Sequence, residues 1–265
     1  MKKWYEMKVI PVKNATSEAE ITIYDEIGIW GVDATGFKED FDKIKNLSKI
    51  KLLINSPGGS VFDGIAIYNM LKDVKDKLTV EISGLAASIA SVIAMAGSEI
   101  VMREGTFLMI HNPWTMAVGD SDEMRKQAET LDQIRDQLVS IYTNNSNLDS
   151  DTINALMAEE TWMDGETAMS YGFVSSVDEA PRIAASFNKD IKNYGFKHLP
   201  DDTEYVPKDN TDITLGETFS EPTVTETTLV DEADVSASDV DAREALLKQI
   251  LVFKINNFLK DEQRK

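Results

Sequence analysis

Two hydrophobic periods alternate along about the first 180 residues of the chain. Short apolar or alternating runs, typical of strands, lie at Glu20–Tyr24, Ile27–Trp30, Lys51–Asn55, Thr79–Ser83, Ile100–Arg103 and Phe107–Ile110. Apolar residues spaced three and four apart, typical of helices, recur over Val61–Val74, Asp122–Tyr142 and Asp151–Glu159. Asp120, followed by Glu123, is a capping-box signal before the second of these helices. Because strands and helices alternate, we expect an α/β fold of right-handed βαβ units with a mostly parallel sheet.

The chain changes character after about residue 200. Residues 201–240 contain twelve acidic residues against a single lysine, Lys208, and are rich in Thr, Ser and Pro. Such a segment buries too little apolar surface to fold alone, so we expect an acidic, disordered linker. Helical spacing returns near the C-terminus, with apolar positions at Leu247, Ile250, Leu251, Ile255, Phe258 and Leu259. We therefore predict a folded domain at 1–197, a flexible linker at 198–240 and an amphipathic helix at 241–265.

Composition and charge argue against several classes of function. The 265 residues carry a net charge of −19, which disfavours binding to nucleic acids or anionic membranes. The chain has no cysteine, which excludes disulfides and thiolate metal sites, and no phosphate-binding loop of the Gly-x-x-x-x-Gly-Lys type. No apolar run reaches the roughly 18 residues that span a bilayer, and Met1–Glu6 does not resemble a secretory signal. We expect a cytoplasmic protein with no metal, no cofactor, no nucleic acid and no membrane among its partners.

A serine follows one of the predicted strands at the point where a helix should begin. Ser88 lies after the strand Leu78–Ser83 and a turn of small residues, Gly84–Ala87, and before the apolar stretch Ile89–Ala96. A hydroxyl at such a corner is exposed, and the N–H of Ile89, at a helix N-terminus, is free to stabilise an oxyanion. A serine is a poor nucleophile unless a base lies within hydrogen-bond reach.

The chain has two histidines, and one of them ends a predicted strand. His111 follows Phe107–Ile110, whereas His198 lies at the entrance to the polar tail, so His111 is the candidate base. The pair Gly58-Gly59 follows another strand and can turn its N–H groups outward, which makes Gly59 a candidate second oxyanion donor. Each of these residues alone more often has a structural role, as a helix cap, a packed histidine or a turn. Together, each at the C-terminal end of its own strand, they indicate acyl transfer.

Three segments, in this order and at this spacing, resemble a known family. Asn55–Gly59, Gly84–Ser88 and Met109–Pro113 are similar to the signature segments of the ClpP family of self-compartmentalising serine peptidases. The likeness extends over Ile21–Val177. It implies the ClpP/crotonase-like spiral of βαβ units as the fold.

The resemblance also implies a role for four residues. Ser88 corresponds to the family's nucleophile and His111 to its general base, and the N–H groups of Gly59 and Ile89 correspond to its oxyanion hole. Over Ser56–Asn69 the chain resembles the ClpP-like proteases encoded among phage and prophage head genes more than the housekeeping enzyme.

The third catalytic residue lies where this chain departs from the family pattern. Counting back from Tyr171-Gly172 places Glu160 where the family usually has aspartate. A glutamate can hold the tautomer of a histidine and stabilise its imidazolium as an aspartate does. We therefore predict Glu160 as the acid, with Glu159 and Asp164 as alternatives. The competing interpretation of Glu160 is a solvated residue at the end of a helix.

These predictions lead to three functional hypotheses. The first is a serine endopeptidase with a Ser-His-Glu triad that processes phage capsid or scaffold proteins during head maturation, in the host cytoplasm or inside the procapsid. The alternative is an ATP-dependent ClpP-type degradative peptidase that works with a AAA+ unfoldase. The third is an inactive crotonase-fold scaffold.

The resemblance also bears on partners. Polypeptides are the expected substrates, and a homo-oligomer, with heptameric rings as in the family, is the expected assembly. In the family, the helix equivalent to Asp122–Tyr142 packs one ring against another, whereas the pattern alone also fits packing within one subunit. The predicted terminal helix has three possible roles: docking on the domain, self-association, or binding a partner in capsid assembly.

Overall fold

The structure is a computed structural model and describes residues 3–12, 17–28, 33–179, 194 and 196–199. The predicted terminal helix at 241–265 lies outside the described residues, as does the predicted linker apart from His198 and Leu199. The expected α/β fold with a mostly parallel sheet is confirmed. No helix in the described part of the chain is both long enough and apolar enough to cross a membrane.

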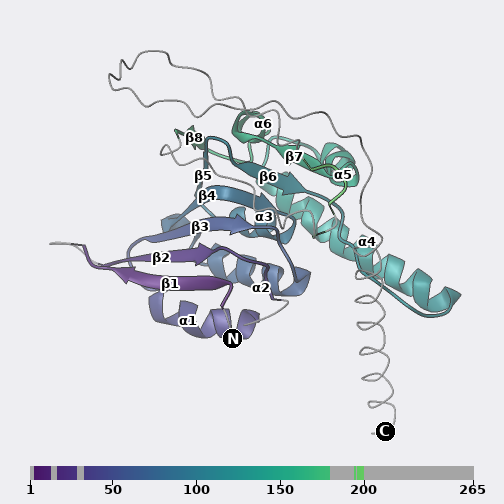
Figure 1. Cartoon of the computed structure of the whole chain (residues 1–265), viewed down its shortest axis with the longest axis horizontal. Coiled ribbons are helices and arrows are strands. Elements are labelled where there is room, and N and C mark those ends of the chain that lie inside the picture. Colours follow the sequence, from purple (N-terminus) through teal and green to yellow (C-terminus); the bar gives the residue numbers. More distant parts are fainter. Residues whose placement is uncertain (1–2, 13–16, 29–32, 180–193, 195, 200–265) are drawn as a thin grey trace, which may run out of the picture. The chain divides into compact units, whose positions relative to one another are not determined.

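A sheet of eight strands forms the centre of the described residues (Figure 1). The strands are β1 Tyr5–Ile10, β2 Glu18–Ile23, β3 Ile50–Ser56, β4 Leu78–Ala87, β5 Glu99–Arg103, β6 Phe107–Ile110, β7 Thr161–Met163 and β8 Ser176–Asp178. Their order is β1-β2-β3-β4-β5-β8, while β6 pairs with both β4 and β7. The pairs β1–β2 and β6–β7 are antiparallel and the other pairs are parallel.

Most helices begin at a side chain that caps them. The helices are α1 Ala34–Ile44, α2 Val61–Lys72, α3 Ile89–Ala94, α4 Ser121–Asn144, α5 Ser150–Ala158 and α6 Gly165–Ser170. A short 3-10 helix, Lys75–Lys77, precedes β4. The capping side chains accept hydrogen bonds from N–H groups of the first turn, and they are Asp33, Ser60, Asp120, Asp149 and Asp164. The predicted capping box before α4 is present.

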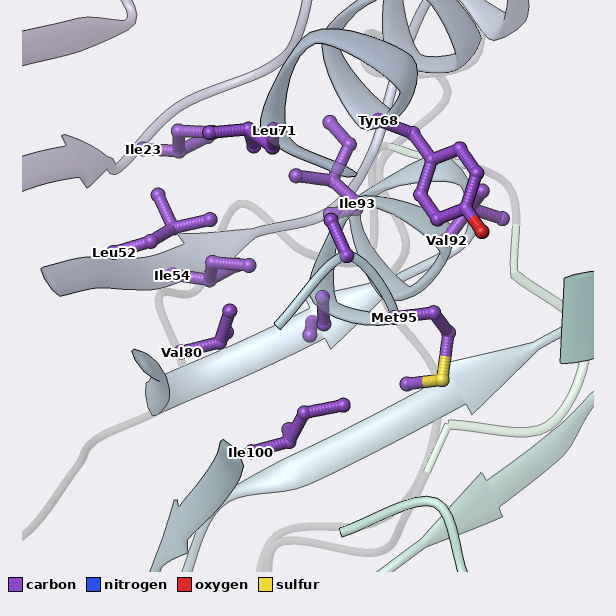
Figure 2. Packing of buried hydrophobic residues seen from close by; sticks show 14 of the residues in the cluster. Ile23, Leu52, Ile54, Tyr68, Leu71, Val80, Val92, Ile93, Met95 and Ile100 are labelled. Atoms are coloured by element: carbon purple, nitrogen blue, oxygen red, sulfur yellow. The ribbon is translucent and has the colours of Figure 1, made fainter. Parts of the chain in front are cut away.

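The main hydrophobic core lies between the sheet and helices α2 and α3. The strands contribute fully or almost fully buried side chains, among them Ile23, Leu52, Ile54, Val80 and Ile100. Figure 2 shows these residues facing the helical side chains Tyr68, Leu71, Val92, Ile93 and Met95. Burial of one side chain of this size contributes about 1.5–3 kcal/mol, so the core fixes the strands whose C-terminal ends carry the motifs.

β4 changes partner along its length. Thr79–Ile82 pair with β5, whereas Leu85–Ala87 pair with β6 and bring Ala87 beside Met109. The expected turn at Gly84–Ala87 is therefore wrong, because the ladder with β6 keeps the chain extended up to Ser88. The corner lies at Ser88 itself.

The pairing of β4 with β3 contains a bulge opposite this change. The register shifts between Ile54 and Ser56, and the side chain of Asn55 accepts a hydrogen bond from the N–H of Leu85 at 3.1 Å. The Asn55 amide thus replaces a missing backbone partner. Because a bulge bends and twists the strands beside it, this one helps to direct the end of β4 toward β6.

The strand expected at Ile27–Trp30 is also wrong over the residues described. Ile27 forms an isolated bridge with Gly59, and Ile29 and Trp30 lie outside the described residues. The N–H of Ile27 donates to the carbonyl of Gly58 at 2.7 Å, and its carbonyl accepts from the N–H of Ser60 at 2.8 Å. The apolar side chain of Ile27 is buried in the core, while its backbone holds the Gly58-Gly59 loop through these two hydrogen bonds.

α4 is 24 residues long, and most of it is exposed. Figure 1 shows its N-terminal part extending away from the sheet. Its buried residues, Leu138, Val139 and Tyr142, lie near its C-terminal end. Met124 and Ala128, on the predicted apolar stripe, are exposed in the described part of the chain.

Candidate active site

Ser88 occupies the corner between the end of β4 and the start of α3. Its φ of 56° and ψ of −128° lie where L-residues are rarely found. Among the described residues other than glycine, a positive φ occurs at Ser88 and at Glu160. Such conformations cost about 1–3 kcal/mol each and cluster at functional sites, where the surrounding structure enforces them. A strained strand-to-helix corner of this kind exposes the serine hydroxyl.

The pairing of β4 with β6 brings His111 to Ser88. Ala87 lies beside Met109, so the parallel strands lead into Ser88 on one side and, after Ile110, into His111 on the other. Nε2 of His111 lies 2.8 Å from Oγ of Ser88, which is a hydrogen-bond distance. With the ring proton on Nδ1, Nε2 accepts the hydrogen bond of the serine hydroxyl, as a general base requires.

The pairing of β6 with β7 brings Glu160 to the other nitrogen of the imidazole. Ile110 lies opposite Thr161, so the next residues outward on the two strands are His111 and Glu160. Oε2 of Glu160 lies 4.0 Å from Nδ1 of His111, which is longer than a hydrogen bond but close enough for electrostatic attraction. Glu160 is 5% exposed, so it is not the solvated residue of the competing interpretation.

The alternative acids have other surroundings. The Asp164 carboxylate caps α6 by accepting from the N–H of Thr167 at 2.8 Å. Glu159 is the C-cap residue of α5 and is exposed. Of the three candidates, Glu160 is the one that the structure brings to His111.

Burial and two neighbouring charges set the pKa of His111. Burial lowers this pKa below the ordinary histidine value because it disfavours the charged imidazolium. The Glu160 carboxylate acts in the opposite direction, and the Lys197 ammonium acts in the same direction as burial. Since the net shift is downward, the imidazole is neutral at neutral pH and able to accept a proton.

Gly58 and Gly59 lie against the serine corner. A Cβ on Gly58 would approach Cβ of Ser88 to 2.8 Å and the nitrogen of Ile89 to 3.2 Å, and one on Gly59 would collide with neighbouring backbone. Their φ angles of 101° and 145° also favour glycine. The N–H of Gly58 donates to Oγ of Ser56 at 3.2 Å, so Gly59 is the candidate oxyanion donor of the pair. The second candidate is the N–H of Ile89 in the first turn of α3.

Comparison with known proteins identifies the family of this fold and site. The family model described as Clp protease matches residues 40–181, which is more than half of the chain. The chain belongs to the Clp protease family. Members of this family are serine-type peptidases, so the protein is a hydrolase, and the matched residues include Ser88, His111 and Glu160.

Similar proteins carry the same family name. The chain is 34% identical over 145 residues to the ATP-dependent Clp protease proteolytic subunit of Leuconostoc citreum (strain KM20), covering 53% of this chain and 71% of that relative. It is 30% identical over 138 residues to the ATP-dependent Clp protease proteolytic subunit of Bacteroides thetaiotaomicron, covering 51% of this chain and 63% of the relative. For the subunit of the same name from Deinococcus radiodurans, the identity is 30% over 136 residues, with 51% and 67% covered.

In this Clp protease a segment far along the chain also reaches the site, and the sequence patterns did not predict it. The N–H groups of Lys197 and His198 donate to Oε1 of Glu160 at 2.7 Å and 2.8 Å. His198, expected at the entrance to the polar tail, also donates from Nδ1 to the carbonyl of Glu159 at 2.8 Å. The described contacts of the domain predicted at 1–197 therefore continue to Leu199, which packs on apolar side chains of β4 and β6. The aromatic residues just before the polar tail were the sequence feature that could have indicated this contact.

A buried pair of hydroxyls behind Ser88 was not predicted either. Oγ of Ser91 donates to the carbonyl of Ser88 at 2.6 Å and lies 2.8 Å from the hydroxyl of Tyr142 in α4. The hydroxyl proton of Ser91 goes to the carbonyl of Ser88, so the Tyr142 hydroxyl is the donor in its contact with Ser91. Burial raises the pKa of Tyr142, which keeps this hydroxyl protonated. The carbonyl of the strained serine is thus connected to α4.

Proposed function

We propose that this protein cleaves polypeptides through an acyl-enzyme on Ser88, with His111 as general base and Glu160 as the residue that orients it. The observation that carries the proposal is the 2.8 Å contact between Nε2 of His111 and Oγ of a serine with a φ of 56°. A strained backbone lowers the stability of the fold, and in an inactive scaffold no function would offset this loss. The strain at Ser88 therefore favours an active peptidase over the scaffold hypothesis.

The proposed reaction begins with a proton transfer. As Oγ of Ser88 bonds to the carbonyl carbon of the peptide, its proton moves to Nε2 of His111. The N–H groups of Gly59 and Ile89 stabilise the resulting oxyanion. The imidazolium then protonates the leaving amine as the C–N bond breaks. A water molecule gives a proton to Nε2 and its oxygen bonds to the ester carbon. The C–Oγ bond then breaks, and the proton moves from Nε2 to Oγ, which releases the second product and restores Ser88 and neutral His111.

Glu160 contributes by stabilising the imidazolium of His111 during these steps. Its carboxylate is buried and faces Nδ1 at 4.0 Å. In enzymes without substrate such contacts are often long and shorten in the substrate complex. We expect this approach to hold the ring proton on Nδ1 and to favour the charged imidazole in the transition state.

The direct test is labelling by a fluorophosphonate probe together with cleavage of a short fluorogenic peptide. The wild type should be labelled at Ser88, and Ser88→Ala should lose both labelling and turnover by orders of magnitude. The matched control is Ser83→Ala, five residues earlier and within β4, which should keep both activities. Appreciable turnover in Ser88→Ala, or a wild type that the probe does not label, would overturn the proposal.

For the route by which substrates arrive, the relatives favour the ATP-dependent hypothesis. Each of the three compared relatives is named an ATP-dependent Clp protease proteolytic subunit. We therefore propose that this protein is the peptidase subunit of a larger assembly that receives unfolded chains from a AAA+ partner. Phage head maturation stays a prediction that rests on the likeness of Ser56–Asn69 to phage proteases.

These two routes differ in what the purified protein can degrade. An ATP-dependent peptidase should cleave short peptides alone but should degrade a folded protein only with a Clp ATPase and ATP. A head protease should cut capsid or scaffold proteins at defined sites without ATP when it is co-expressed with them. Neighbouring genes give a first indication, since portal and capsid genes favour the second route and a Clp ATPase gene the first.

A further inference from the structure

We propose that the segment Phe196–His198 positions the catalytic acid, with the N–H groups of Lys197 and His198 holding Glu160 toward His111. The inference rests on the proposed function, in which His111 takes the proton of Ser88. It adds a positioning element that lies 37 and 38 residues beyond Glu160 in the chain.

The two oxygens of Glu160 are used unequally. Oε1 accepts from the N–H of Lys197 at 2.7 Å, from the N–H of His198 at 2.8 Å and from Nε1 of Trp162 at 3.3 Å. A carboxylate offers about four acceptor sites on its two oxygens, so the three donors leave no free site on Oε1. Oε2 is left to face Nδ1 of His111 at 4.0 Å. The donors therefore fix the rotation of the carboxylate and direct one oxygen at the imidazole.

The donors also make it possible to bury the charge. Glu160 is 5% exposed, and an unpaired carboxylate in such surroundings is strongly unfavourable. Two of its three hydrogen bonds come from the backbone of the segment. A substitution that removes one of these N–H groups should let the carboxylate rotate or admit water.

Aromatic contacts hold the segment in this position. The ring of Phe196 meets the imidazole of His111 edge-on at 6.0 Å between centroids, and it meets the indole of Trp162 at 5.3 Å. Tyr194 and Leu199 pack in the same apolar cluster. Phe196 thus contacts the general base directly while the next two residues hold the acid.

The segment acts on His111 through two opposite charges. The Glu160 carboxylate that it orients favours the imidazolium, while the ammonium of Lys197 disfavours it. Ser88, the third group at the ring, is uncharged. If the segment only covered the site, loss of one of its N–H groups would not change the pH dependence of acylation. This pH dependence therefore distinguishes a positioning role from a covering role.

The test uses the full-length chain and follows the rate of Ser88 acylation from pH 4.5 to 8. His198→Pro removes one N–H donor and keeps the charge of Lys197. We expect acylation to slow by roughly ten-fold or more, because a lost hydrogen bond to a charged group has about this effect, while KM changes little. The pH at half-maximal rate should fall, because a less well-oriented Glu160 supports the imidazolium less. His198→Ala keeps the N–H but loses the Nδ1 hydrogen bond to the carbonyl of Glu159, so it should slow acylation less than His198→Pro does.

Lys197→Ala should shift the pH dependence of acylation in the opposite direction. It keeps the N–H but removes the ammonium, so the pH at half-maximal rate should rise. Trp162→Phe removes the third donor while keeping an aromatic ring, and should act in the same direction as His198→Pro. If circular dichroism shows that His198→Pro does not fold, Trp162→Phe alone tests the inference.

Normal rates and pH profiles in His198→Pro and Trp162→Phe would overturn the inference and leave the segment as a cover only. If only Trp162→Phe folds, its normal profile alone would do so. A wild type without labelling at Ser88 would instead overturn the proposed function itself, so the two failures are distinguishable.

Discussion

At the scale of single residues, strain and burial coincide at the proposed catalytic groups. Ser88 and Glu160 both have a positive φ, and both lie one residue outside a strand that pairs with β6. Each backbone conformation costs about 1–3 kcal/mol. The hydrogen bonds around them offset this cost, since the N–H of Ser88 donates to β6 and Glu160 accepts three hydrogen bonds. The strain thus aims two side chains at one imidazole.

Glu160→Gln should cost nearly as much activity as His111→Ala. An amide can hold the wrong tautomer and cannot stabilise the imidazolium, and the corresponding change in another triad lowers turnover by on the order of 10⁴. The measurement is the acylation rate of each purified variant. Glu159→Gln and Asp164→Asn serve as controls, and the acid would have to be reassigned if one of them were inactive while Glu160→Gln kept its activity.

The rate should rise with pH through a single titration of His111. The base must be neutral, so the rate is low below its pKa and reaches a plateau above it. Because burial lowers this pKa, the half-maximal rate should lie below the ordinary histidine value of about 6.5. A pH profile of kcat/KM for a short peptide measures it directly. A midpoint clearly above this value would contradict the geometry given for His111.

At the scale of elements, the site depends on contacts between helices and strands. The hydroxyl of Tyr142 in α4 reaches Ser91 of α3, and Ser91 in turn donates to the carbonyl of Ser88. Tyr142 is 1% exposed, so its hydroxyl depends on Ser91 for a partner. The end of α4 is therefore connected by hydrogen bonds to the proposed nucleophile.

The two hydroxyls should contribute unequally to stability. Ser91→Ala leaves the Tyr142 hydroxyl buried without its partner and should lower the free energy of unfolding by about 1–3 kcal/mol. Tyr142→Phe leaves Ser91 bonded to Ser88 and should cost only about 0.5–1.5 kcal/mol. The double variant should cost less than the sum of the two single changes, because it leaves no buried tyrosine hydroxyl without a partner. Urea denaturation measures all three, with the exposed Ser140→Ala of α4 as control, and simple additivity would argue against the coupling.

At the scale of the whole molecule, α4 presents apolar surface that the described residues do not cover. Met124 is 36% exposed and lies on the same stripe as the exposed Ala128. The relatives are named as subunits, and we expect this face to contact another copy of the chain. A helix with one buried end and exposed apolar residues near the other is suited to such an interface.

Met124→Glu should reduce the size of the assembly without unfolding the subunit. A charge at the centre of an apolar contact is costly, whereas an exposed position tolerates it in the monomer. Sedimentation velocity gives the assembly size and circular dichroism the fold. The control is Lys126→Glu, which introduces the same residue on a different side of α4, and an unchanged assembly in both variants would remove α4 from the interface.

Much of the local structure could be predicted from sequence, because it depends on neighbouring residues. The period of apolar residues gives β3, β6, α2, α4 and α5 to within a few residues, and the capping box marks the start of α4. The strand–helix junction at Ser88 and the strand end at His111 are also visible in sequence. β1, β7, β8, α1 and α6 were missed because their patterns are short or weak.

Tertiary structure alone decided which of these residues meet. The sequence supplied a serine, a histidine and a predicted acid, Glu160, with two alternatives, but the registers of β4 with β6 and of β6 with β7 bring Glu160 to His111. The same is true of Lys197 and His198, whose N–H groups carry no sequence signal. Helix periods and caps are encoded within a few neighbouring residues. Strand register and the partners of a buried carboxylate instead depend on hydrogen bonds between segments far apart in the chain, and only the folded molecule determines these.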